Sequence, residues 1–230
     1  MIRLRERSAA EALARHQATP PRIYSEDDIQ VNRIVTARNT LGKAMSTWNR
    51  NPIHKRGKVI ELGCGMADIC GHFSWGHNVI GYESTPNLLP LIGRRYPWME
   101  VKLGDIQTIP PEDCDFLILC EILEHLADPN ALCERWLPHT EFVLISSPID
   151  EHKLDFSKGS LTDPRTGEPL EDISGGEHIW SFTAEDFEHF FELGSHNLID
   201  SSSGIIGSLP IWMGVGRKKP LDIATTNPSG

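Results

Sequence analysis

The spacing of apolar residues changes near residue 58. Before that point apolar residues recur every three or four positions, which predicts amphipathic helices. The first predicted helix ends at the prolines 20 and 21, which cannot continue a helix, and its apolar positions are Leu4, Ala9, Ala12 and Leu13. The second runs to residues 51–52 with Ser25 and Asp28 as a capping box, and its apolar positions are Ile29, Ile34, Leu41, Met45 and Trp48.

From residue 58 onwards short apolar runs alternate with helix-like stretches. Runs without strict alternation of apolar and polar residues are typical of strands that are buried on both faces. Strands of this kind separated by helices predict an α/β protein with a doubly wound, mostly parallel sheet. The runs occupy residues 58–62, 78–83, 100–105, 114–121 and 141–147, and a final strand is expected in 208–218 after a capped helix that ends at Gly194.

These patterns divide the chain into three parts, the second of which contains a long insertion. Residues 1–57 are expected to form an N-terminal helical extension or lid, and residues 58–217 the main domain. Within that domain residues 149–180 are polar, rich in turn residues and too long for an ordinary connection, which predicts a cover over the substrate pocket. Residues 218–230 are expected to form a flexible tail.

Composition excludes several classes of protein. The 230 residues, 39% hydrophobic and 23% charged, suffice for a buried core and exclude wholesale disorder. Nowhere is there an apolar stretch of the roughly 18 residues that a membrane helix needs, and the first residues lack the apolar region of a secretory signal. Five cysteines, an odd number, in apolar contexts indicate reduced thiols in a cytoplasmic protein.

Charge is distributed unevenly along the chain. The net charge is −10, yet residues 1–57 carry eleven Lys and Arg against five Asp and Glu, a local excess of +6. The remaining residues are therefore strongly acidic. Because phosphate binding depends mostly on Lys and Arg, an acidic body argues against a broad nucleic-acid surface. The basic segment is explained either by steering of an anionic ligand or by packing against the acidic body.

A glycine-rich turn follows the first of the apolar runs. The sequence there is Glu61, Leu62, Gly63, Cys64, Gly65, Met66, Ala67, Asp68. Glycines let a backbone approach a ligand closely, and the free N–H groups of a following helix add hydrogen-bond donors. The dinucleotide-binding fingerprint requires Gly or Ala at position 68, and the acid at position 61 would repel a pyrophosphate. Hydride-transfer chemistry is therefore disfavoured.

This turn resembles the first motif of the class I S-adenosylmethionine-dependent methyltransferases. That motif is an acid followed by Gly-x-Gly-x-Gly; Glu61, Gly63 and Gly65 match it, and Ala67 replaces the third glycine. In the family an acid that ends the second strand binds the ribose hydroxyls, and Glu83 lies at that position, twenty-two residues after Glu61. The resemblance implies a seven-stranded, Rossmann-like sheet and the cofactor S-adenosyl-L-methionine. The other residues that it implies at the cofactor are Cys64, Ser84, Asp105 (at the adenine amino group), Ile106 and Cys120.

A second constellation follows the fourth apolar run. At helical spacing Glu121, Glu124 and His125 share one face, and His178 comes later in the chain. This set is similar to one in the quinone-biosynthesis O-methyltransferases and the small-RNA 2′-O-methyltransferases, where it is associated with a divalent metal. The resemblance implies Mn, Fe, Co, Zn or Mg at these four residues. Alternatively, the segment only shapes the pocket and His178 caps the next helix.

The function predicted from these residues is methyl transfer from S-adenosylmethionine to a hydroxyl oxygen of a small molecule, such as a vicinal diol or a catechol. Glu121, His125 and His178 are the candidate catalytic residues, either through a metal or with a histidine as general base. RNA 2′-O-methylation and N- or C-methylation are alternatives. A non-catalytic, cofactor-binding partner protein is an alternative of another class. The sequence leaves the identity of the acceptor and the oligomeric state open.

Overall fold

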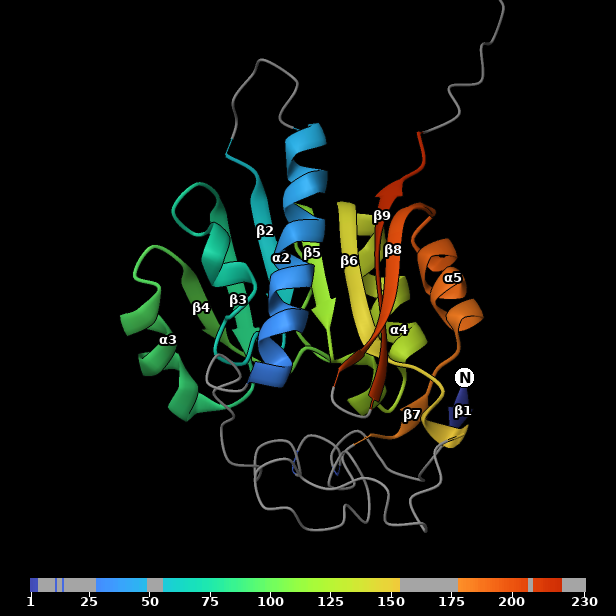
Figure 1. Cartoon of the computed structure of the whole chain (residues 1–230). Helices are drawn as coiled ribbons and strands as arrows, with labels where there is room; N and C mark the ends of the chain where they lie inside the picture. Colours follow the sequence, from blue (N-terminus) through green and yellow to red (C-terminus); the bar gives the residue numbers. More distant parts are fainter. Residues whose placement is uncertain are drawn as a thin grey trace, which may run out of the picture.

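A single large sheet organises the chain. The computed structural model describes residues 1–3, 11, 14, 28–48, 56–153, 178–206 and 209–220. In this part of the chain the sheet has seven strands in the order β4-β3-β2-β5-β6-β9-β8 (Figure 1). The strands are β2 (Lys58–Leu62), β3 (Asn78–Glu83), β4 (Glu100–Leu103), β5 (Cys114–Cys120), β6 (Thr140–Pro148), β8 (His196–Ile206) and β9 (Leu209–Lys218). β2 to β6 run parallel, and β9 is antiparallel to both β6 and β8. The predicted mostly parallel, seven-stranded α/β fold is confirmed.

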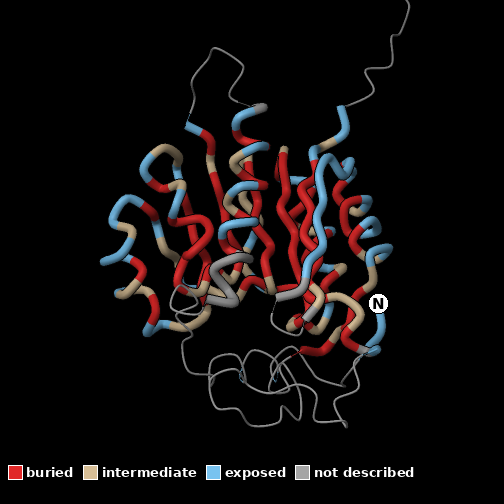
Figure 2. Tube along the Cα trace, viewed as in Figure 1, coloured by how far each residue is buried: buried red, intermediate tan, exposed pale blue. Residues whose placement is uncertain are grey.

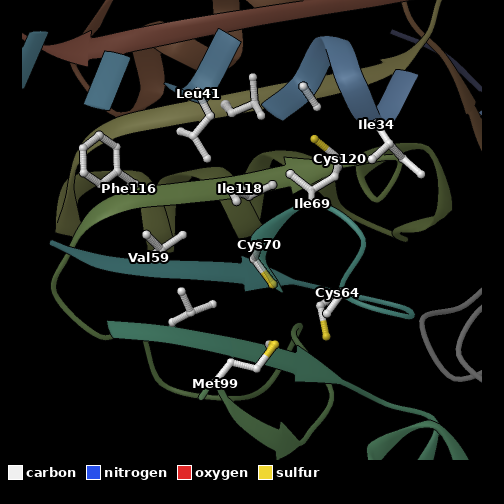
Figure 3. Close-up of a cluster of buried hydrophobic side chains, with 14 of the residues drawn as sticks. Ile34, Leu41, Val59, Cys64, Ile69, Cys70, Met99, Phe116, Ile118 and Cys120 are labelled. Carbon is white, nitrogen blue, oxygen red and sulfur yellow. The ribbon is translucent and has the colours of Figure 1, made fainter. Parts of the chain in front are cut away.

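Helices cover both faces of this sheet and leave its central strands buried (Figures 1 and 2). On one face Leu41 of helix α2 belongs to the same apolar cluster as Phe116 of β5 (Figure 3). On the other face Trp136 of α4 and Phe187 of α5 share a cluster with Leu117. The α-helices are α2 (Asp28–Trp48), α3 (Leu89–Arg95), α4 (Pro129–Trp136) and α5 (Ala184–Leu193).

Burial on both faces explains why β5 is apolar at successive positions. Phe116 and Ile118 point into the cluster under α2, whereas Leu117 and Leu119 point into the cluster under α4 and α5. All four side chains are fully buried. The sequence pattern therefore identified the central strands because parallel sheets with helices on both faces require it.

Helix α2 lies in the segment that the sequence assigns to an N-terminal extension, yet it forms part of the core. Its inward side chains are buried against β-strand residues. The Arg38 side chain also donates from Nε to the Asp68 carbonyl oxygen at 2.8 Å, which ties α2 to the segment after the glycine-rich turn. Four predicted features lie wholly or mostly outside the described residues: the first helix, of which only residues 11 and 14 are described, the cap Ser25 of the second helix, most of the cover (154–177) and the end of the tail (221–230).

Three strands were not predicted from the sequence, whereas one helix is confirmed in detail. The edge strand β8 was not predicted, because its middle, residues 200–203, is polar and exposed. β1 (Ile2–Arg3) pairs antiparallel with β7 (Trp180–Ser181), far away in the sequence, so local patterns could not reveal this small sheet. Helix α5 begins with the expected capping box, here between Thr183 and Asp186, and is followed by Gly194. No described helix is long and apolar enough to cross a membrane.

Candidate functional site

The predicted cofactor residues lie at the carboxyl edge of the parallel strands. The ladder pairs Leu62 with Tyr82 and Glu83 with Leu103, so β2, β3 and β4 end side by side. Asp105 follows two residues after the last of these pairs. In open α/β sheets ligands bind outside this edge, where the strand order changes direction. In this sheet the change lies between the neighbouring strands β2 and β5.

The glycine-rich turn adopts a backbone that few residues tolerate. Gly63, Gly65 and Ala67 have positive φ angles of 65°, 53° and 57°. A Cβ on Gly63 would lie 2.1 Å from Cδ1 of Ile122, so this glycine is required for packing. A Cβ on Gly65 would meet no atom within 4 Å, so at this position the backbone faces open space. Gly65 therefore offers the close approach that a cofactor needs, and Ala67 adopts the left-handed conformation expected of the glycine it replaces.

Glu83 joins the second strand to this turn. Its Oε2 accepts a hydrogen bond from the Gly65 N–H at 2.9 Å, and its Oε1 accepts one from the Thr85 N–H at 2.8 Å. The residue is only 1% exposed. Both oxygens of the carboxylate are therefore tied to backbone N–H groups. The arrangement fixes the carboxylate beside the turn before any ligand arrives.

Glu61 also accepts a hydrogen bond from the backbone of the protein. This buried carboxylate accepts a hydrogen bond from the Cys70 N–H at 3.0 Å, at the start of the short 3-10 helix η2 (Cys70–Phe73). It therefore holds the segment after the turn in place. Burial, followed by the charge of Glu61, raises the pKa of the Cys64 and Cys70 thiols well above the ordinary value. All five cysteines are free thiols, as the sequence predicted.

Asp105 and its neighbours are the remaining predicted cofactor residues. Asp105 is half-buried, and its Oδ1 accepts a hydrogen bond from the Gln107 N–H at 2.9 Å. Arg135 of α4 holds this loop by donating to the carbonyl oxygens of Ile106 and Gln107, each at 2.5 Å. The other predicted cofactor residues are Ser84, which is half-buried, and Cys64, Ile106 and Cys120, which are buried.

The second constellation is not the single helical face that the spacing predicted. Glu121 has a positive φ of 56° and lies outside the short 3-10 helix η4 (Leu123–His125). Ser146 Oγ donates to Glu121 Oε1 at 2.8 Å, and Ser147 Oγ donates to Glu124 Oε2 at 2.7 Å. Two successive serines of β6 therefore each hold one of the two glutamates.

Three of the four predicted metal ligands nevertheless come together. Glu124, His125 and His178 each offer one ligand atom, and these atoms lie within 4.8 Å of one another. Glu124 Oε1 lies 4.0 Å from His125 Nε2, and the two imidazole rings meet edge to face with their centroids 4.8 Å apart. Glu124 and His178 are buried, and His125 is half-buried. Glu121 is not a member of this cluster.

His178 is held in the cluster by contacts that the sequence did not reveal. Its Nδ1 lies 2.9 and 2.8 Å from the two carboxylate oxygens of Glu151, which is buried. The next residue, Ile179, donates its backbone N–H to the Glu124 carbonyl oxygen at 2.7 Å. No local motif marks Glu151, which lies 27 residues from His178 in the chain. The cap of the following helix α5 is instead formed by Thr183 with Asp186, so capping is not the role of His178.

The electrostatics of this cluster favour a positive charge. Burial, followed by the charge of Glu121, raises the pKa of Glu124 to about 8. Burial alone would lower the pKa of His178, but the hydrogen bond and charge of Glu151, with Glu124 and Glu121, raise it. Both groups therefore hold protons tightly. A divalent cation is able to take the place of these protons, and a carboxylate with two imidazoles is a mixed oxygen and nitrogen ligand set.

Comparison with known proteins agrees with this geometry. Residues 60–137 match the methyltransferase domain family. An uncharacterized 37.1 kDa protein in a transposon of Streptomyces fradiae is 36% identical over 86 residues. That match covers 33% of this chain and 25% of the other protein, so it spans only about a quarter of the relative's length.

Solved structures show the same fold across almost the whole chain. The magnesium protoporphyrin IX methyltransferase of Synechocystis, solved with bound S-adenosylhomocysteine, has a TM-score of 0.65 at 12% identity and covers 92% of this chain and 95% of its own. The N-methyltransferase NodS of Bradyrhizobium japonicum, in complex with the same compound, has a TM-score of 0.64 at 11% identity, with 93% and 100% covered. Residues 60–137 therefore resemble the methyltransferase domain family, and the chain has the fold of these methyltransferases, which were solved with S-adenosylhomocysteine.

Proposed function

We propose that this protein transfers the methyl group of S-adenosylmethionine to a hydroxyl oxygen of a small molecule, with the help of a divalent cation. The observation that carries the proposal is that the Glu124, His125 and His178 cluster begins two residues after Ile122, which packs on Gly63 of the glycine-rich turn. A cofactor site and an acidic, imidazole-containing site thus share one edge of the sheet.

The cofactor half fits S-adenosylmethionine by its shape and its acceptors. Gly65 leaves space for a ligand next to its backbone, and the Glu83 carboxylate is fixed beside that space to accept hydrogen bonds from ribose hydroxyls. Asp105 would face the adenine from the neighbouring loop. When bound, S-adenosylmethionine supplies an activated methyl group on a sulfonium sulfur. The protein then has to align the acceptor with that methyl group and keep water out.

The second half of the site fits an oxygen acceptor. A hydroxyl is a weak nucleophile at neutral pH, so it needs help to lose its proton. Glu124, His125 and His178 would hold the cation, whose charge would lower the pKa of a neighbouring hydroxyl. One carboxylate and two imidazoles suit Mn²⁺, Fe²⁺, Co²⁺ or Zn²⁺ better than Mg²⁺, which prefers oxygen ligands. A vicinal diol or a catechol fits best because it presents two oxygens to one cation.

The test is to measure S-adenosylhomocysteine release from a panel of catechols and vicinal diols, with their O-methylated analogues as blanks. We expect turnover with a free hydroxyl, a fall after chelation and the strongest recovery with a transition-metal ion. His178→Ala should lose the response to metal while its affinity for S-adenosylhomocysteine stays unchanged. Glu112→Gln, a change in a cluster with Lys58 and Lys102, is the matched control and should behave like the unmodified protein.

Two results would contradict the proposal in different ways. Full activity in the presence of chelator, combined with an inactive His125→Ala variant, would leave His125 as a general base without metal. Tight binding of S-adenosylhomocysteine without turnover on any acceptor of the panel would instead favour a cofactor-binding partner protein. Product analysis by mass spectrometry distinguishes a methylated oxygen from a methylated nitrogen or carbon.

A further inference from the structure

The contact between Glu151 and His178 gives a role to a residue outside every motif of the sequence. Both side chains are buried, Glu151 at 4% and His178 at 8% exposure. The imidazole Nδ1 lies within 2.9 Å of both carboxylate oxygens, so a protonated Nδ1 donates to Glu151. In the neutral ring this bond selects the tautomer with its proton on Nδ1. Nε2 is then the nitrogen that carries the lone pair.

The backbone around Glu151 is built to present this side chain. Asp150, the residue before it, has a positive φ of 58°, which turns the chain sharply after β6. Two hydrogen bonds fix that turn: the Asp150 N–H donates to the Phe182 carbonyl at 2.8 Å, and the Lys153 N–H donates to the Asp150 carbonyl at 2.9 Å. Non-glycine residues in this conformation persist only where the surrounding structure holds them. The turn places Glu151 in the short 3-10 helix η6 (Glu151–Lys153), against His178.

The other side of the contact is equally anchored. Ile179 donates to the Glu124 carbonyl, and Trp180 Nε1 donates to the Leu126 carbonyl at 2.8 Å. The segment that carries His178 is therefore bonded to Glu124 within η4 and to Leu126 directly after it. Three separate segments of the chain meet at one imidazole ring. A buried charged pair is a weak source of stability, since its desolvation offsets most of its attraction, so stability alone is a poor reason for placing Glu151 here.

We propose that Glu151 is a positioning residue, which fixes the tautomer and orientation of His178 so that Nε2 is offered to a cation shared with Glu124 and His125. This inference rests on the proposed function for the identity of the cation, but the tautomer of His178 does not depend on it. Carboxylates that hold a ligating histidine in this way contribute about 10- to 100-fold to metal affinity.

The first test uses the full, unmodified chain. Two-dimensional ¹H–¹⁵N spectra of ¹⁵N-histidine-labelled protein distinguish a ring protonated on Nδ1 from one protonated on Nε2, and the His178→Gln variant identifies the His178 signals. We expect the neutral His178 ring of the metal-free protein to carry its proton on Nδ1. A neutral ring with its proton on Nε2 would overturn the proposal, even if every Glu151 variant failed to fold.

The second test compares Glu151→Gln and Glu151→Asp with the control Glu112→Gln. Calorimetry with Mn²⁺ or Co²⁺ alone should show affinity reduced by about 10- to 100-fold in Glu151→Gln, a partial recovery in Glu151→Asp and no change in the control. Affinity for S-adenosylhomocysteine should be unchanged in all three. The proposal would be overturned if a folded Glu151→Gln variant bound metal within about threefold of the affinity of the unmodified protein, a change well below the expected range.

The two tests also separate this inference from the proposed function. If the unmodified protein binds neither metal, the cation in the proposed function fails. In that case a His178 proton on Nδ1 that is lost in Glu151→Gln still supports the positioning role of Glu151. If metal binds and supports turnover but the tautomer is independent of Glu151, the proposed function stands and the positioning role falls.

Discussion

The two glycines of the glycine-rich turn allow a matched pair of substitutions. One should mainly weaken cofactor binding, and the other should mainly lower the stability of the fold. Both have left-handed backbones, with φ angles of 65° at Gly63 and 53° at Gly65. An alanine in that conformation costs about 1–2 kcal/mol, offset by about 0.4–1 kcal/mol from the reduced freedom of the unfolded chain. Gly65→Ala should therefore lower the free energy of unfolding by only about 1 kcal/mol. Its methyl group, however, enters the open space beside Gly65, where we propose that the cofactor binds.

Gly63→Ala carries the same backbone cost plus a clash. Its Cβ would lie 2.1 Å from Ile122 Cδ1, so the isoleucine or the turn has to move. Overpacking of this kind costs about 1–3 kcal/mol, which brings the expected loss of stability to about 2–4 kcal/mol. Urea denaturation measures both losses. Calorimetry with S-adenosylhomocysteine should show at least a roughly tenfold loss of affinity, about 1.4 kcal/mol, in Gly65→Ala.

The comparison is decisive because each variant is the control for the other. If Gly63→Ala were as stable as Gly65→Ala, the turn would not pack on Ile122 as the structure shows. If Gly65→Ala folded and bound S-adenosylhomocysteine as tightly as the unmodified protein, the open space beside Gly65 would not be where the cofactor lies.

Three further predictions concern the surroundings of the site. Glu83→Gln should reduce affinity for S-adenosylhomocysteine by more than about tenfold, because hydrogen bonds to a charged acceptor contribute about 1.5–3 kcal/mol; calorimetry on the folded variant checks this. The hydrogen bond from Lys102, followed by those from neighbouring groups, lowers the pKa of Glu112 from 4.5 to about 2. The stabilisation by Glu112 should therefore be complete above about pH 4.5 and disappear as the pH falls toward 2, so the melting temperatures of the unmodified protein and Glu112→Gln should converge on acidification. Trp180→Phe keeps an aromatic ring but loses the indole hydrogen bond to the Leu126 carbonyl. Urea denaturation should show that the free energy of unfolding falls by about 1–3 kcal/mol.

The cofactor half of the site could be predicted because its information is local. Glu61, Gly63 and Gly65 lie within five residues of sequence. The turn needs glycine at positions where the backbone is left-handed. Glu83 could be placed because parallel strands end at a common edge, so a residue that ends the next strand lies next to the turn. The sequence did not reveal that Glu61 bonds to the backbone of η2, since a strand-terminal acid has the same appearance in either role.

The Glu124, His125 and His178 cluster could be predicted only in part, because its geometry depends on a non-helical backbone and on contacts from distant segments. The spacing of Glu121 and Glu124 suggests one helical face, but residue 121 is left-handed and the helix that follows has only three residues. Each carboxylate is held by a hydrogen bond from a serine of β6, Ser146 for Glu121 and Ser147 for Glu124. Glu151 escaped notice for a related reason. Its importance comes from a contact across 27 residues, and no periodicity or motif encodes such a contact.

The charge balance of the cluster explains why these acids can share one buried place. Glu124 and Glu151 are almost fully buried, and unpaired carboxylates there would cost several kcal/mol each. Glu151 is paired with His178, whose raised pKa reflects that contact, whereas Glu124 has a pKa of about 8 because burial and Glu121 disfavour its charged form. A metal-free site therefore holds its balance with protons. A divalent cation between Glu124 and His178 would supply the same positive charge while releasing those protons, so metal binding should tighten as the pH rises.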